Sequence, residues 1–268
     1  MPSVASNKAK VAKRVIEVLD FFDEEHPQAT VMDIVRRFNR PQSSTSELLS
    51  SLVELGLLYK DPYLRSYSPT PRAAMLGTGV QPRFVRDGRL PTLIDRLAAQ
   101  TGLGVAMFGM VGLNVQLFSW RAGLQKVRTS GSAGLCGGLQ ERLSDSAAGW
   151  LLLSTVSQPR RDGVIRRLNA EAPAERKFAF AGMATHVQQC RDLGHATGPA
   201  GFSAAADTTA VLVPAQAENQ PLAVGFIYEP SERLDPSALL RCLTDAVTRC
   251  IEEQAPVLDS VQPLFNAA

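Results

Sequence analysis

Apolar side chains recur at helical spacing in three segments near the N-terminus of the chain. Within each segment they stand three or four residues apart, as on the buried stripe of an amphipathic helix. We therefore expect helices over residues 8–22, 30–38 and 41–55. The second of them opens with Thr30 and Asp33, which have the spacing of a capping box.

Two short runs with the composition of strands follow, over residues 57–60 and 65–68, and a proline-containing turn separates them. Three helices and a hairpin in this order predict a winged helix-turn-helix. The next stretch, residues 71–89, is rich in proline and glycine, which is the composition of a domain boundary. We therefore expect one domain over residues 1–70 and a larger one over residues 90–268, joined by this linker.

Helical and strand patterns alternate beyond residue 90. We expect helices over residues 90–100, 144–156, 160–169, 183–192 and 236–253, and strands over residues 105–110, 115–120, 124–130, 209–213 and 222–228. Mixed elements in this order favour a single α+β domain, with an antiparallel sheet covered by helices.

Composition narrows the class of protein. The chain has 268 residues, of which 45% are hydrophobic and 20% charged, the proportions of an ordinary globular protein. Its net charge of +2 is too small to indicate a nucleic-acid partner by itself. No apolar run reaches the roughly 20 residues that a membrane-spanning helix needs, and the N-terminus lacks the pattern of a secretory signal. We therefore expect a cytoplasmic protein without a membrane partner.

Motifs for metal binding and catalysis are missing from the sequence. The four cysteines are scattered, without a CxxC pair or a histidine at ligand spacing, which favours reduced thiols and no metal site. There is no GxSxG around Ser132 or Ser203, no GxxxxGK, no GxGxxG after a predicted strand and no HExxH. We expect no cofactor, no catalytic residues and no enzymatic activity, and a small-molecule hydrolase with a helix-turn-helix appendage stays an alternative.

The run TVMDIVRRFNRPQSSTSELLSSLVELGLLYKDP, with the rest of residues 10–70, resembles the DNA-binding domain of the IclR-type family, named for the isocitrate lyase regulator. Weaker similarity extends to residues 90–105, to SDSAAGWLLL at residues 144–153 and to PLAVGFIYEP at residues 221–230. The resemblance implies an α+β protein with an N-terminal winged helix-turn-helix and a C-terminal GAF-like α/β effector domain built on an antiparallel sheet. It also implies a homodimer or homotetramer that binds a palindromic operator in double-stranded DNA and controls metabolic operons.

Two features depart from the family pattern. The wing of the family has a glycine before its arginine and aromatic residue, whereas Leu64 precedes Arg65 and Tyr67 here. The third predicted helix lacks the basic residues that many members carry, so direct contacts to DNA phosphates fall to its flanks.

The polar side of the third predicted helix is the candidate surface for reading DNA. A recognition helix reads base edges in the major groove with three or four side chains, and glutamine, glutamate and serine can all bond to base edges. Backbone N–H groups at the start of the helix favour a phosphate oxygen, and flanking lysines and arginines supply salt-sensitive attraction. The candidate DNA-binding residues are Arg36, Arg40, Gln42, Ser43, Ser44, Thr45, Ser46, Glu47, Ser50, Lys60 and Arg65.

The effector pocket of the family, carried over by position, gives a second set of candidates. The helix that starts at Ala147 and Ala148 would offer backbone N–H groups to a carboxylate. Phe226 and Tyr228 lie two apart on one predicted strand and so point to one face, where they form either an aromatic pocket lining or ordinary core. The candidate effector-binding residues are Val127, Ala147, Ala148, Thr208, Thr209, Phe226 and Tyr228.

The sequence therefore predicts a DNA-binding transcription regulator whose operator affinity changes when a small organic acid, aromatic or otherwise bulky, binds the C-terminal domain. Winged helices also serve in protein contacts. A winged-helix protein-interaction module is therefore a further alternative, and it predicts no salt-dependent affinity for DNA.

Overall fold

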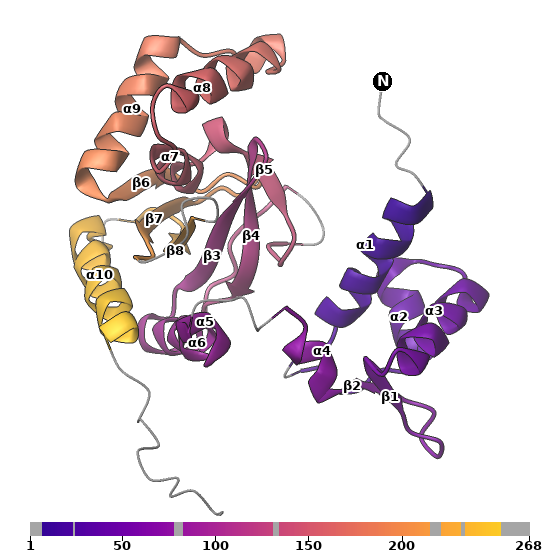
Figure 1. Cartoon of the computed structure of the whole chain (residues 1–268). Coiled ribbons are helices and arrows are strands. Elements are labelled where there is room, and N and C mark those ends of the chain that lie inside the picture. Colours follow the sequence, from indigo (N-terminus) through magenta and orange to yellow (C-terminus); the bar gives the residue numbers. More distant parts are fainter. Residues whose placement is uncertain are drawn as a thin grey trace, which may run out of the picture. The chain divides into compact units, whose positions relative to one another are not determined.

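The computed structural model of the chain describes residues 7–23, 25–77, 83–130, 134–214, 221–231 and 234–252. It divides into two compact units, Met1–Gln81 and Pro82–Ala268 (Figure 1). Each unit has buried hydrophobic clusters of its own.

The described part of the N-terminal unit holds three helices, an antiparallel hairpin and a further short helix. In order, these elements are α1 (Asn7–Asp20), α2 (Val31–Phe38), α3 (Gln42–Glu54), β1 (Leu58–Lys60), β2 (Tyr67–Pro69) and α4 (Pro71–Met75). The winged helix-turn-helix predicted from the sequence is confirmed.

The predicted capping box fixes the start of α2. The Thr30 hydroxyl oxygen accepts a hydrogen bond from the Asp33 backbone N–H, and the Asp33 carboxylate accepts one from the Thr30 backbone N–H at 2.8 Å. Hydrogen bonds from Thr30 hold the pKa of the Asp33 carboxyl below its ordinary value. The charged carboxylate therefore stabilises α2 at neutral pH, and this contribution is lost as the pH falls through the lowered pKa.

The apolar side of α3 packs in the core of the N-terminal unit. Leu49 is 0% exposed and Leu52 is 1% exposed, and both belong to one buried cluster with Ile34 of α2 and Leu58 of β1. Burying a leucine side chain contributes about 2 kcal/mol, so these two residues fix which side of α3 turns inward. Leu55, which the sequence places on the same face, is 61% exposed because it lies at the C-cap, beyond the last helical residue.

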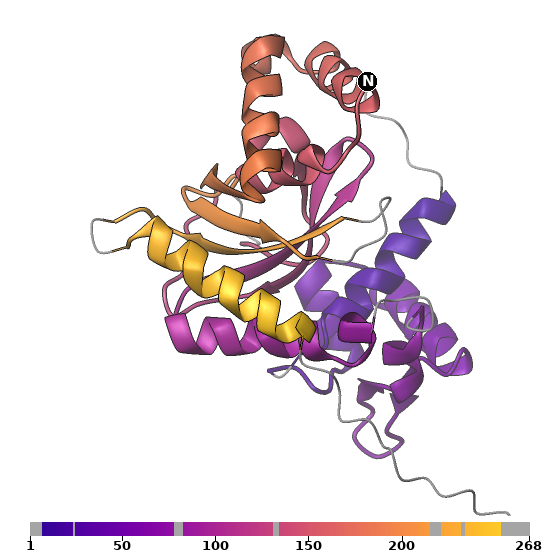
Figure 2. The same ribbon diagram turned by 60° about the vertical axis from the view of Figure 1, so that its left-hand side comes forward.

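The C-terminal unit is an antiparallel sheet with helices on both faces (Figures 1 and 2). Its strands are β3 (Gly104–Val111), β4 (Asn114–Arg121), β5 (Gln140–Arg142), β6 (His195–Pro199), β7 (Asp207–Leu212) and β8 (Leu222–Tyr228). Its helices are α5 (Arg83–Arg86), α6 (Arg89–Thr101), α7 (Ala147–Ser154), α8 (Arg160–Ala170), α9 (Phe180–Leu193) and α10 (Pro236–Glu252), with short 3₁₀ turns η2 (Leu143–Asp145) and η3 (Ala174–Arg176). The predicted α+β class is confirmed.

The strand order of the sheet is β5-β4-β3-β8-β7-β6, and neighbouring strands are antiparallel. One face carries α7, α8 and α9, and the other carries α6 and α10 (Figures 1 and 2). Successive residues of a strand point to opposite faces. Ile227 therefore packs in the core beneath α7, whereas its neighbour Phe226 packs in the core beneath α6 and α10.

Four elements of this unit differ between the prediction and the structure. Residues 124–130 form no strand, only an isolated bridge between Thr129 and Ala204. The sequence did not predict β5, because it has only 3 residues. Nor did it predict β6, because the sequence HATGP contains glycine and proline, which are rare in strands. The helix predicted from residue 144 begins at Ala147, since the Ser146 hydroxyl caps it by accepting a hydrogen bond from the Gly149 N–H at 3.1 Å.

The predicted linker, residues 71–89, contains α4 at its start and α5 near its end. Ala73 of α4 packs against the core of the N-terminal unit, and Val85 of α5 packs against the core beneath α6 and α10. Residues 78–82 lie outside the described residues, and the boundaries of the linker stay a prediction.

Two helical glycines predict opposite effects on stability. A β-carbon at Gly149 in α7 would lie 2.4 Å from the Leu143 carbonyl oxygen, whereas a β-carbon at Gly163 in α8 would meet no atom within 4 Å. We expect Gly149→Ala to destabilise the protein by about 1–3 kcal/mol through this clash. Gly163→Ala should stabilise it by up to about 1 kcal/mol through helix propensity. Urea unfolding followed by circular dichroism measures both, and shifts of the same sign and size would contradict the described packing.

Candidate DNA interface and effector site

A row of polar side chains on α3 is turned to solvent. Gln42, Ser43, Glu47 and Ser50 are exposed, and Ser46 is half-buried. The spacing of Ser43, Glu47 and Ser50 places them on the side of the helix away from the buried leucines, whereas Gln42 is exposed as the first residue of the helix. These are the side chains that the sequence assigns to base reading, and the fold of the N-terminal unit leaves them open.

The start of α3 has backbone donors without a side-chain cap. Pro41 is the N-cap residue and makes no capping hydrogen bond, so the N–H groups of the first turn stay available to an anion. The Ser44 hydroxyl is half-buried and donates to the Pro41 carbonyl at 3.2 Å. Thr45 is 4% exposed, and both its hydroxyl and its backbone N–H donate to the same carbonyl. Thr45 is therefore part of the core, and its predicted DNA contact is wrong.

Arg40 is held within the N-terminal unit. Its guanidinium forms an ion pair with Glu17 of α1 and lies over the Phe38 ring, 5.3 Å from the ring centroid. The Arg40 side chain is only 21% exposed. Because a carboxylate of the same unit neutralises its charge, Arg40 ties α1 to the turn before α3, contrary to the prediction of a free phosphate contact.

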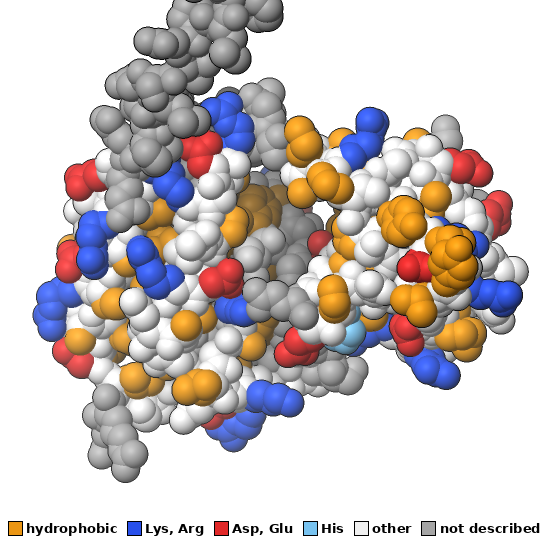
Figure 3. Space-filling view, turned by 90° about the horizontal axis from the view of Figure 1, so that it is seen from below, with side chains coloured by type: hydrophobic (Ala, Val, Ile, Leu, Met, Phe, Trp, Pro, Cys, Tyr) orange, Lys and Arg blue, Asp and Glu red, His pale blue; other side chains and the backbone are white. Residues whose placement is uncertain are grey.

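The other predicted basic residues, Arg36, Lys60 and Arg65, are exposed. The Lys60 ammonium lies 5.6 Å from the centroid of the Tyr67 ring. Arg65 adopts a left-handed backbone conformation with φ of 53°, which is uncommon for a residue other than glycine. Figure 3 shows Lys and Arg side chains on the surface of the N-terminal unit, next to hydrophobic ones.

The predicted effector residues fall on two faces of the sheet. Ala147 and Ala148 belong to the core beneath α7, and Thr208 shares this side because it pairs with Ile227 across the sheet. The residues on the opposite side, beneath α6 and α10, are Thr209, Phe226 and Tyr228. One pocket therefore does not contain all of these residues.

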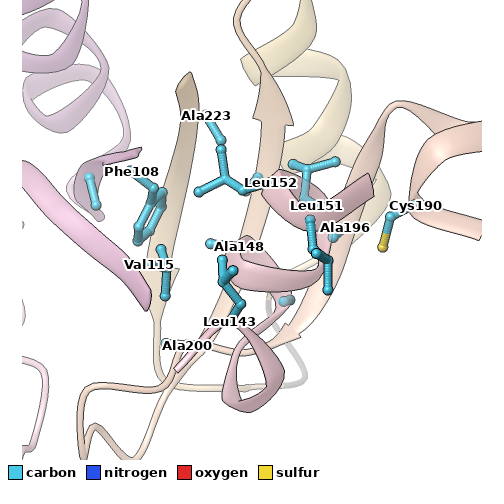
Figure 4. Packing of buried hydrophobic residues seen from close by; sticks show 14 of the residues in the cluster. Phe108, Val115, Leu143, Ala148, Leu151, Leu152, Cys190, Ala196, Ala200 and Ala223 are labelled. Carbon is cyan, nitrogen blue, oxygen red and sulfur yellow. The ribbon is translucent and has the colours of Figure 1, made fainter. Parts of the chain in front are cut away.

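The start of α7 is closed by the chain itself. Ala147 and Ala148 are 0% exposed, and Figure 4 shows Ala148 among buried leucines. The loop after β6 lies over this helix end, since a β-carbon on Gly201 would be 3.0 Å from the β-carbon of Ser146. Phe202 is 8% exposed, and the centroid of its ring is 6.3 Å from that of Phe108. The predicted carboxylate site is therefore not open here.

Charge also disfavours a further carboxylate at this place. Glu141 accepts a hydrogen bond from the Phe202 backbone N–H at 3.1 Å. Arg176 lies 3.5 Å from a Glu141 oxygen and 2.9 Å from an Asp145 oxygen. Two carboxylates thus share one guanidinium, and an added anion would be repelled. Nothing local in the sequence signals Phe202, because it reaches this helix end from a distant segment of the chain, whereas Glu141 stands six residues before the first residue of α7.

Phe226 and Tyr228 do point to one face, as predicted, but that face is the core beneath α6 and α10. Phe226 is 0% exposed and is ordinary core, whereas Tyr228, which is 4% exposed, also lines a small hollow at one end of the sheet. The Tyr228 hydroxyl lies 2.9 Å from the Thr209 hydroxyl, which in turn lies 3.2 Å from that of Thr197. Burial raises the pKa of the Tyr228 phenol.

Val127 and Tyr228 meet at one end of the sheet. They line a small hollow whose other lining residues include Lys126, Glu229, Leu234 and Gly104 at the start of β3. The Arg128 guanidinium donates to both carboxylate oxygens of Glu229, at 2.8 and 3.0 Å, and these bonds lower the pKa of Glu229. Two of the predicted effector residues and the exposed cation Lys126 thus share one hollow.

Among the described residues, no three His, Cys, Asp or Glu side chains are placed to hold a metal ion. The four cysteines, all within the described residues, form no disulfide, and burial raises the pKa of Cys190 to about 11, so that thiol stays protonated at neutral pH. Within the same residues, no helix has the length and apolar character needed to cross a membrane.

Residues 11–62 match the family model of the IclR helix-turn-helix domain. The fold is similar to that of an IclR homolog from Microbacterium hydrocarbonoxydans complexed with 4-hydroxybenzoate, with a TM-score of 0.57 at 17% identity over 90% of this chain and 97% of that one. An IclR transcriptional regulator from Alicyclobacillus acidocaldarius gives a TM-score of 0.54 at 18% identity, over 90% of this chain and 97% of that one. The effector domain of an IclR regulator from Acinetobacter sp. ADP1 gives 0.53 at 20% identity, over 63% and 96%.

Among curated proteins no sequence matches the chain. The matched helix-turn-helix segment runs from α1 into the hairpin and contains the whole of α3 with its open polar face. The chain is thus similar to IclR-type regulators in two respects: residues 11–62 match the sequence model of their helix-turn-helix domain, and the chain as a whole shares the fold of their solved structures.

Proposed function

We propose that the chain binds operator DNA through α3 and the hairpin, and that a small organic acid bound by the C-terminal unit changes this affinity. The observation that carries the proposal is the open polar face of α3 inside a matched helix-turn-helix domain. Gln42 suits an adenine edge, and Glu47 can accept from a cytosine amino group. Ser43 and Ser46 are small enough to let the helix lie deep in the major groove.

Affinity in this proposal comes from the flanks of α3. Arg36, Lys60 and Arg65 attract the phosphates, and their contribution weakens with salt. The uncapped first turn of α3, at Ser43 and Ser44, offers backbone N–H groups to one phosphate oxygen. Base choice therefore rests on the helix, and the strength of binding rests on its surroundings.

We propose a cytoplasmic homodimer or homotetramer that binds a palindromic operator. Two copies on one duplex must present their recognition helices about 34 Å apart, one turn of DNA. The C-terminal units would have two arrangements, of which one fits the operator and the other does not. An acid that binds one arrangement more tightly would shift the population toward it, and the ratio of its two affinities limits how far operator affinity can change. No reaction is assigned to the chain.

For the acid we propose the hollow that Val127 and Tyr228 line, with Lys126 as the partner of the carboxylate. The relative from Microbacterium hydrocarbonoxydans holds 4-hydroxybenzoate, and this supports an aromatic acid for the present chain. Because the hollow is small, entry of an aromatic ring requires the segment of residues 124–130 to move. The Arg128 bonds to Glu229 and the Ser130 N–H bond to the Ser203 carbonyl hold that segment.

The basic experiment is a mobility-shift titration of the full chain on the intergenic DNA upstream of its own gene, at several salt concentrations. We expect a shifted complex whose affinity falls steeply with salt, with a slope near −0.9 per phosphate contact on a log–log plot. Addition of 4-hydroxybenzoate should change the midpoint. A chain that binds no DNA at low salt would overturn the proposal in favour of a protein-interaction module.

Arg36 and Arg40 give a matched pair of variants. Arg36→Ala should weaken DNA binding and reduce the salt slope by about 1, with unchanged thermal stability. Arg40→Ala breaks a half-buried ion pair and should destabilise the N-terminal unit by about 1–2 kcal/mol, while the salt slope stays that of the parent. Mobility shifts and thermal unfolding separate the two effects. Equal losses of slope would show that Arg40 also contacts a phosphate.

Calorimetry of the full chain tests the acid. We expect 4-hydroxybenzoate and benzoate to bind, and Lys126→Ala to weaken binding roughly tenfold through loss of a charge-assisted hydrogen bond. Arg191→Ala, an exposed cation on α9, is the control and should leave binding unchanged. Binding of glyoxylate in place of both aromatic acids would contradict the aromatic assignment, and an unaffected Lys126→Ala would place the site elsewhere.

A further inference from the structure

The tip of the hairpin between β1 and β2 is apolar, although tight turns on a protein surface are usually polar. Tyr63 is 94% exposed and Leu64 is 66% exposed, and Pro62 before them is exposed as well. Figure 3, which views the molecule from below, shows hydrophobic side chains gathered on the N-terminal unit with Lys and Arg side chains nearby. Exposed apolar side chains that cluster in this way mark a contact surface.

The backbone of the tip is held rigidly. One carboxylate oxygen of Asp61 accepts hydrogen bonds from the N–H groups of Tyr63 and Leu64, at 2.8 and 2.9 Å. The Asp61 N–H donates to the Ser66 carbonyl at 2.8 Å, which closes the base of the turn. Because these bonds fix the backbone of Tyr63 and Leu64, only their side chains have to order on binding.

The charge around the tip fits a polyanion. Lys60 and Arg65 are exposed on either side of it. The one carboxylate between them, that of Asp61, accepts hydrogen bonds from the backbone of the tip, which partly offset its charge. An approaching phosphate backbone therefore meets two cations and an apolar point.

We propose, taking the DNA binding proposed above as the premise, that Tyr63 and Leu64 form an apolar wedge. The wedge enters the minor groove beside the major-groove bases that face α3 and unstacks one base step. Apolar side chains that insert in this way kink the duplex and let it wrap more protein surface. The placement follows from the chain, because only residues 55–57 separate α3 from β1 and the two elements are in contact.

The size of the tip favours DNA over a second protein surface. A tyrosine buries about 150–250 Å², and a stable protein interface needs about 800 Å² from each partner. The area of a tip with two apolar residues is far below what a stable protein interface buries. One base step, in contrast, needs only one or two inserted side chains. The pyrimidine–purine steps, which unstack most easily, are the expected targets.

The test uses the full chain and a duplex that the chain itself selects from a random pool. 2-Aminopurine placed in turn at each step next to the selected bases reports unstacking by its fluorescence, and energy transfer between end labels reports bending. We expect one step to brighten and the duplex to bend on binding. Tyr63→Ser with Leu64→Ser should abolish both signals and lower affinity roughly tenfold, whereas Tyr63→Phe with Leu64→Met should retain them.

The control is Leu193→Ser, which removes a leucine of similar exposure, 63%, from the C-terminal unit and should change neither signal. Circular dichroism checks that the serine variant folds. We expect it to fold, because Asp61 bonds only to backbone atoms of Tyr63 and Leu64.

If the parent binds the duplex and the serine variant keeps unstacking and bending, the wedge is refuted while the DNA-binding function stands. If the serine variant instead loses self-association, the tip belongs to a contact between copies and the wedge is also refuted. A parent that selects no DNA would overturn the function itself.

Discussion

The burial of one side of α3 is the constraint on which the rest of the account depends. Leu49 and Leu52 pack against α2 and β1 with essentially no exposure. A helix repeats every 3.6 residues, so fixing these two positions inward fixes the opposite row, which includes Ser43 and Glu47, outward. The leucines supply the stability of the unit, and the polar row is left without a role in its core. The polar side of α3 is therefore exposed and can contact a partner.

A second constraint, the alternation of side chains along a strand, shapes the C-terminal unit. Phe226 and Ile227 are adjacent in sequence but pack in different cores, beneath α6 with α10 and beneath α7. The same alternation places Thr208 and Thr209, both predicted to bind the effector, on opposite faces of the sheet. Phe226 is buried in the core, and a small hollow lies at the sheet end, where Val127 and Tyr228 line it.

Local patterns in the sequence predicted much of the fold, including the three N-terminal helices, the hairpin and the capping box of Thr30 and Asp33. They also predicted the open side of α3, because helical periodicity needs no knowledge of the tertiary structure. They failed where distant segments meet. The pairing of Arg40 with Glu17 and the cover of Phe202 over the start of α7 depend on contacts between segments far apart in the chain, which no spacing encodes. Thr45 was misplaced because its hydroxyl is satisfied inside the helix by the Pro41 carbonyl.

The most direct test of the central claim is the base preference of the full chain, selected from a random pool of duplexes, compared between the parent and Gln42→Ala or Glu47→Ala. If the open side of α3 reads DNA, each variant should lose preference at one position of each half-site, at a cost of about 1–3 kcal/mol for the lost contact, with an unchanged salt dependence. Unaltered preferences at all positions in both variants would show that another surface reads the bases, and the account of α3 would fail.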